Sequence, residues 1–120
     1  MDANRIQNLI DQLNYWDLRV STLECNYFAD EVELSYNDED AKVFIKFLEC
    51  YEVNFDHYKS YDKLRPVKEM TFPQMPYFLQ DIQVSTKMEE NINFYSCKIN
   101  MSPLNLYICC KNIKIYRELN

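Results

Sequence analysis

The sequence predicts an α+β protein, with a mainly antiparallel β-sheet or sandwich of about seven or eight strands and one N-terminal amphipathic helix. Apolar residues recur at helical spacing only near the N-terminus, whereas most of the remaining chain alternates apolar and polar residues as half-buried strands do. Short polar segments separate many of these stretches, which favours hairpins. The length of 120 residues, without a linker or repeat, predicts a single domain over residues 1–120.

The N-terminal segment carries the signals of a helix. Asp2 is of a residue type that often caps a helix N-terminus. Ile6, Leu9, Ile10 and Leu13 follow at the spacing of one helix face. We therefore expect these four side chains to form an apolar stripe that packs on the sheet.

The period changes to two after Trp16 and predicts a first hairpin. Leu23–Tyr27 and Val32–Tyr36 both alternate in polarity, and the short link at Ala29 and Asp30 favours an antiparallel connection. Asn37–Asp40 then ends the second strand in residues that form Asx turns.

Six further strands are expected along the rest of the chain. A turn or bulge at Leu48–Cys50 separates the first two of them, and a turn at Lys111 and Asn112 precedes the last. His57–Pro76, which contains three prolines, is expected to be the longest loop. The expected strands are Val43–Phe47, Tyr51–Phe55, Tyr77–Val84, Phe94–Ile99, Leu104–Cys110 and Ile113–Ile115.

The composition excludes several classes of protein. With 19 acidic and 13 basic residues, the formal charge of −6 argues against a protein that binds nucleic-acid phosphate. Glycine is absent, which excludes the Walker A, Rossmann and nucleophile-elbow motifs, because each needs glycine backbone at fixed positions.

The chain also lacks the features of a secreted or membrane protein. The first segment has no apolar core of a signal peptide, and the longest apolar run, Leu106–Cys110, is far shorter than the roughly 20 residues of a transmembrane helix. We therefore expect a cytoplasmic protein without membrane contact, in which the five cysteines are reduced and mostly buried.

No catalytic, cofactor-binding or metal-binding residues are expected. His57 is the only histidine, and a nucleophile–base pair of Cys50 with His57 would lack a third group to orient it. The cysteines do not have the paired spacing of a zinc site. Asp38–Asp40 lacks the glycine and the terminal glutamate of a calcium-binding EF-hand loop.

Charge is unevenly distributed along the chain. Residues 1–58 contain 13 acidic and 4 basic side chains, whereas residues 59–120 contain 6 acidic and 9 basic ones. This asymmetry favours an acidic surface that binds a basic partner, and the alternative is a solvated face without a partner. The candidate partner-binding residues are Asp30, Glu31, Glu33, Tyr36, Asp38, Glu39 and Asp40, with Tyr27 as a second aromatic anchor.

The outer face of the predicted sheet needs a cover. Four large apolar or aromatic side chains lie on the face opposite to the one that carries most apolar residues of their strands: Phe44, Leu48, Tyr107 and Tyr116. The helix can cover part of this face, and a bound protein or a second copy of the chain in a homodimer can cover the rest.

The order of elements resembles a known group of proteins. It consists of a short amphipathic helix, a Trp16–Asp17 element leading into Arg19–Glu24, the acidic hairpin Glu31–Phe47, and the C-terminal segment Asn105–Ile115. In this layout the chain resembles the small β-rich immunity proteins that bacteria encode beside polymorphic or contact-dependent toxins. The resemblance implies a cytoplasmic, non-enzymatic protein that binds one cognate toxin domain and neutralises it, often through charge complementarity with a basic nuclease.

Three other functions compete with this interpretation. A small-ligand-binding β protein would show a continuous inward-facing pocket lined by Phe and Tyr. A hydrolase would place His57 in a cleft with a perturbed carboxylate or Cys50. The third alternative is a structural subunit of a larger complex.

Overall fold

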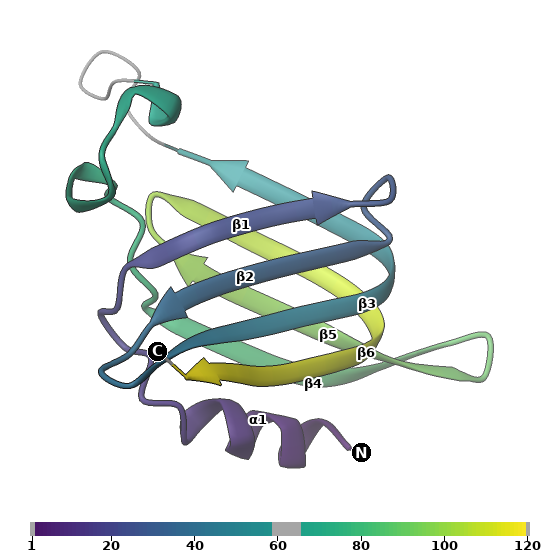
Figure 1. Ribbon diagram of the computed structural model, residues 1–120. Helices are drawn as coiled ribbons and strands as arrows, with labels where there is room; N and C mark the ends of the chain where they lie inside the picture. The colour runs from purple at the N-terminus through teal and green to yellow at the C-terminus, as the bar shows by residue number, and fades with distance from the viewer. Residues whose placement is uncertain (1, 59–65, 120) are drawn as a thin grey trace.

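The computed structural model describes residues 2–58 and 66–119, and within them one α-helix and six strands (Figure 1). All the strand pairs are antiparallel, and the strands lie in the order β1-β2-β3-β6-β5-β4 of a single sheet. This confirms the α+β class and the N-terminal helix. In chain order the elements are α1 (Ala3–Asp11), β1 (Val20–Asn26), β2 (Glu31–Asn37), β3 (Ala41–His57), the 3₁₀ turns η1 (Val67–Glu69) and η2 (Phe72–Gln74), β4 (Asp81–Glu89), β5 (Ile92–Met101) and β6 (Leu104–Leu119).

The expected number of strands, seven or eight, is wrong because two pairs of predicted strands are single bent strands. β3 continues through a bulge, in which Tyr51 is an additional residue that has no partner on β6. Glu49, two residues before it, has its backbone in the left-handed region (φ 54°). β6 likewise continues past Lys111: Cys110 is buried in the core, and Ile113, three residues later, is partly buried and packs against it. A bulge or bend interrupts the alternation of polarity as a turn would, so the sequence alone does not distinguish them.

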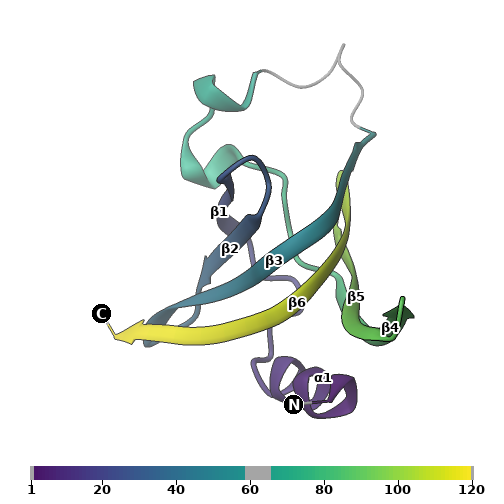
Figure 2. The ribbon, with the colours of Figure 1, turned by 90° about the vertical axis from the view of Figure 1, so that its right-hand side faces the viewer.

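The sheet curves around its core. Figure 2 shows β3 and β6 bending along their length. Buried residues of every strand form one hydrophobic cluster with the helix, including Leu34, Ile45, Phe47 and Ile108, each with no exposed surface. The segment that enters β1 pairs with the segment that enters β4: the N–H of Val20 donates to Tyr77 O (2.8 Å). This bond joins the two edges of the sheet, β1 and β4, at one end.

The helix docks on the outer edge of β4. Asp2 caps it as predicted, because its carboxylate accepts the N–H of Arg5 (2.8 Å). Ile6 and Ile10 are buried as expected, but Leu9 is 40% exposed. The carboxamide of Gln7 accepts the N–H of Val84 and donates to the carbonyl of Ile82, as the peptide of a neighbouring strand would.

The predicted β1–β2 hairpin is confirmed. Its turn contains three consecutive residues in the left-handed region, Tyr27 (φ 54°), Phe28 (φ 57°) and Ala29 (φ 70°). Glycine usually occupies such positions because it has no Cβ to clash with the backbone. Figure 1 shows the helix below the sheet and this turn at the right-hand end of β1 and β2, on the opposite edge of the sheet from β4.

Candidate partner-binding surface

The acidic residues predicted to form one patch lie at two ends of β2. Asp30 is in the β1–β2 turn, whereas Asp38, Glu39 and Asp40 are in the β2–β3 turn (Figure 1). At the rise of an extended strand, about 25 Å separates Asp30 from Asp38. Residues that are close in sequence are therefore split between two regions of the surface.

Asp38 uses its carboxylate to build the β2–β3 turn. Its Oδ1 accepts the N–H groups of Asp40 (2.9 Å) and Ala41 (2.8 Å), and its Oδ2 is 2.7 Å from Nη2 of Arg117. The hydrogen bond from Asp40 is the main cause that lowers the pKa of Asp38 below its ordinary value. Glu39 and Asp40 are exposed at the tip of the turn.

Glu31 and Glu33 lie on the outer face of the sheet and already have partners. Glu31 forms an ion pair with Lys46 (3.3 Å), and their hydrogen bond raises the pKa of Lys46. Glu33 accepts a hydrogen bond from the hydroxyl of Tyr116 (3.4 Å). Both carboxylates therefore belong to a face of mixed charge.

Tyr36 cannot contact a partner directly, so its place among the candidate residues was wrong. Its side chain faces the core with no exposed surface. Burial raises the pKa of its hydroxyl, which has no hydrogen-bond partner among the described residues. The alternation that identified Tyr36 as apolar correctly placed it on the inner face, and that position removes it from the surface.

The β1–β2 turn exposes two aromatic side chains. Tyr27 is 73% exposed, and Phe28 is fully exposed. The alternation of polarity predicted Tyr27 in a strand, and Phe28 was not among the predicted partner-binding residues. Two adjacent aromatics directly before the Ala29–Asp30 link were the available signal, since consecutive apolar residues at a hairpin turn have no core to enter.

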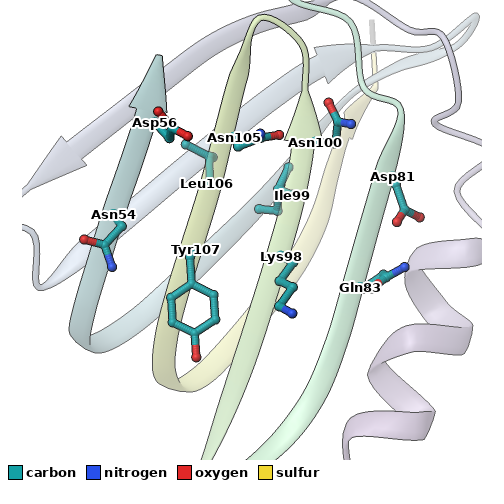
Figure 3. Close-up of a pocket in the computed structure, with 10 residues that line it drawn as sticks. All are labelled: Asn54, Asp56, Asp81, Gln83, Lys98, Ile99, Asn100, Asn105, Leu106 and Tyr107. Atoms are coloured by element: carbon teal, nitrogen blue, oxygen red, sulfur yellow. The ribbon is translucent and has the colours of Figure 1, made fainter. Parts of the chain in front are cut away.

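A groove of about 440 Å³, lined mostly by residues with polar side chains, crosses the outer face of β3, β6, β5 and β4 (Figure 3). The register aligns Asp56, Asn105, Asn100 and Asp81 in one row across these strands. The next row consists of Asn54, Tyr107, Lys98 and Gln83. Four carboxamides and groups of both charges suit hydrogen bonding to a polar ligand or to a protein surface.

The outer face of β3 and β6 also carries an aromatic pair. The rings of Phe44 and Tyr116 stack at 4.7 Å, and the ammonium of Lys42 lies 5.4 Å from the Phe44 ring. The helix lies at the β4 edge and does not cover this pair. The expectation that the helix covers part of the outer face is wrong, because its buried residues Ile6 and Ile10 pack into the core on the inner face of the sheet.

His57 and Cys50 are not brought together. Both lie on β3, separated by about 20 Å at the rise of a strand. His57 Nε2 is 2.7 Å from the hydroxyl of Tyr77, while Cys50 lies opposite Cys110. The hydrogen bond with Cys110, followed by burial, raises the pKa of the Cys50 thiol. A higher thiol pKa lowers the fraction of reactive thiolate.

The described residues 2–58 and 66–119 contain no group of three or more His, Cys, Asp or Glu side chains placed to hold a metal ion. Within the same residues, no helix has both the length and the apolar character to cross a membrane.

The fold and these surfaces define a small acidic protein with one curved antiparallel sheet, a helix on its β4 edge, and charged and aromatic groups presented to solvent. Residues 2–117 match the family model described as "Immunity protein PIM7", and the chain belongs to this family. Comparison of the sequence with curated proteins finds no match. The resemblance to immunity proteins of toxin systems is thereby confirmed.

Proposed function

We propose that this protein binds a cognate bacterial toxin domain in the cytoplasm and neutralises it by contact, without catalysis. The observation that carries the proposal is the match of residues 2–117 to an immunity protein family. The separation of His57 from Cys50 along β3 is consistent with action by binding.

The proposed partner is basic. The chain has a formal charge of −6, and Asp30, Glu39 and Asp40 are exposed and form no ion pair within the described residues. Unpaired carboxylates attract a positively charged surface over several ångströms and accelerate its association. Asp30, Glu31, Glu33, Asp38, Glu39 and Asp40 remain the proposed acidic contacts, with Glu31 and Asp38 already neutralised by Lys46 and Arg117.

Two other surfaces offer alternatives. The groove around Tyr107 could contact the toxin in place of the acidic turns, because its carboxamides supply donors and acceptors. The stacked Phe44 and Tyr116 could instead face a second copy of the chain. Sedimentation of the free protein measures whether that homodimer exists.

A co-expression experiment tests the proposal. The toxin-like domain encoded by the adjacent gene is induced in bacterial cells with and without this protein, and survival is counted. We expect the protein to restore growth and to co-purify with the toxin domain. Val32→Asp, which places a carboxylate at a fully buried position of β2, should abolish both effects by unfolding the protein. Growth arrest despite abundant folded wild-type protein would exclude this toxin as the partner.

A further inference from the structure

We infer that the β1–β2 turn, Tyr27–Asp30, is the aromatic anchor that enters an apolar pocket with a basic rim on the toxin. This inference rests on the proposed function and names the contact that would carry most of the binding. Tyr27 and Phe28 present large apolar surfaces to water in the turn at the end of the β1–β2 hairpin (Figure 1). Aromatic residues are enriched at the buried centres of interfaces, and Tyr is among the residue types in which binding hot spots concentrate.

The backbone of the turn is held in a conformation that its residues disfavour. Tyr27, Phe28 and Ala29 all have positive φ, although each has a Cβ that clashes in the left-handed region. Strain of this kind persists where surrounding contacts enforce it, and it is frequent at ligand-binding segments. The strained backbone holds two aromatic side chains exposed to solvent, where a partner can contact them.

Two hydrogen bonds hold the turn in place. The N–H of Asp30 donates to the carbonyl of Tyr27 (3.1 Å), which closes the turn. The carbonyl of Asp30 accepts the N–H of Cys50 (2.9 Å) at the bulge of β3, which ties the turn to the centre of the sheet. An anchor fixed before binding loses less conformational entropy on association than a mobile loop does.

The charges around the turn select the chemistry of the partner. Asp30 lies within the turn, Glu24 precedes the turn on β1, and Glu31 follows it on β2. Of these three carboxylates, Glu31 alone forms an ion pair within the described residues. The acidic rim therefore favours a protein pocket bordered by Lys or Arg. It repels nucleic-acid phosphate, and it also repels the same turn of a second copy.

Binding kinetics with the immobilised toxin domain test the inference. Phe28→Ala and Tyr27→Ala remove the aromatic rings and keep a Cβ, so the backbone strain is little changed. We expect Phe28→Ala to accelerate dissociation about 30-fold or more, with a much smaller change in the association rate. Phe28→Tyr should largely restore slow dissociation, because it returns the aromatic ring.

The β4–β5 turn offers a matched control. Met88 and Ile92 are exposed large apolar residues beside that turn, which also contains two residues with positive φ, Glu90 and Asn91. Met88→Ala and Ile92→Ala should leave both rate constants unchanged. Circular dichroism and the melting temperature verify that each variant is folded.

The outcomes separate the inference from the proposed function. If the wild type binds and Phe28→Ala and Tyr27→Ala dissociate at the wild-type rate, the anchor inference is wrong, while toxin neutralisation stands. If the folded wild type does not bind the toxin domain, the proposed function fails for that partner, and the anchor inference fails with it. Faster dissociation of Met88→Ala together with normal Phe28→Ala would move the contact to the β4–β5 turn.

Discussion

The N–H of Cys50 donates a hydrogen bond to the carbonyl oxygen of Asp30 (2.9 Å), which joins the β1–β2 turn to the bulge in β3. The bulge leaves Tyr51 without a residue opposite it on β6, and the bend of β3 brings the Cys50 amide to the turn. Because of this bond, an exposed turn without glycine keeps a fixed position relative to the sheet.

Ala29→Gly should stabilise the protein. Ala29 has φ 70°, where the Cβ of alanine costs roughly 1–2 kcal/mol and glycine has no such clash. Glycine loses more conformational entropy on folding than alanine does, which offsets part of this gain. We therefore expect the free energy of unfolding to rise by about 0.5–1 kcal/mol. Urea unfolding measures it. Ala41→Gly, at a buried position in β3, is the control and should destabilise.

Gln7→Ala should destabilise the protein by about 2–3 kcal/mol in the same urea assay. The side chain bonds the carbonyl of Ile82 (2.8 Å) and the N–H of Val84 (2.6 Å), and its loss leaves both groups of the β4 edge without their partner. Gln12→Ala, at the exposed end of the helix, should change stability by less than about 0.5 kcal/mol. Equal effects of the two substitutions would show that Gln7 does not hold the helix on β4.

Asp38 should make stability depend on pH under acidic conditions. Its pKa in the folded protein is lower than the value of 3.8 for a free side chain, so its contribution is complete above that value. The contribution is lost as the pH falls through the lowered pKa. Asp38→Asn keeps a turn acceptor but removes the charge beside Arg117. Melting temperatures of wild type and variant should therefore differ at neutral pH and converge in strong acid.

Charge reversal should distinguish the two ends of β2. Glu24→Lys with Asp30→Lys alters the β1–β2 end, and Glu39→Lys with Asp40→Lys alters the β2–β3 end. At low salt we expect the first pair to slow toxin association about tenfold or more and the second pair to slow it less. Raising the ionic strength should reduce both differences, because the Debye length falls to about 8 Å at physiological salt.

A pair of reversals elsewhere provides the control for net charge. Glu69→Lys with Glu90→Lys makes the same change in charge at exposed positions in η1 and the β4–β5 turn, outside both turns of β2. If this variant associates as slowly as Glu24→Lys with Asp30→Lys, steering depends on net charge alone and not on the β1–β2 turn.

The sequence by itself determined the helix, the antiparallel strands and the inner face of the sheet. Periodicity carries this information, because burial requires apolar residues at the spacing of each element. Ile6 and Ile10 on the helix, and Leu34 and Ile45 on the strands, are buried as their spacing predicted. The same spacing assigned Tyr36 to the apolar side.

Only the tertiary structure decided how these elements continue, where the helix lies and which charges meet. The strand count depended on the bulge after Cys50 in β3 and on the shift of alternation near Lys111 in β6, because each interrupts the pattern of polarity in the same way as a turn. The acidic residues are divided between two regions of the surface because β2 lies between them. An extended strand holds its two ends far apart, even though the residues at those ends are close in the sequence. The exposure of Phe28 required the left-handed turn and its bond to Cys50, which is a contact between residues far apart in the chain.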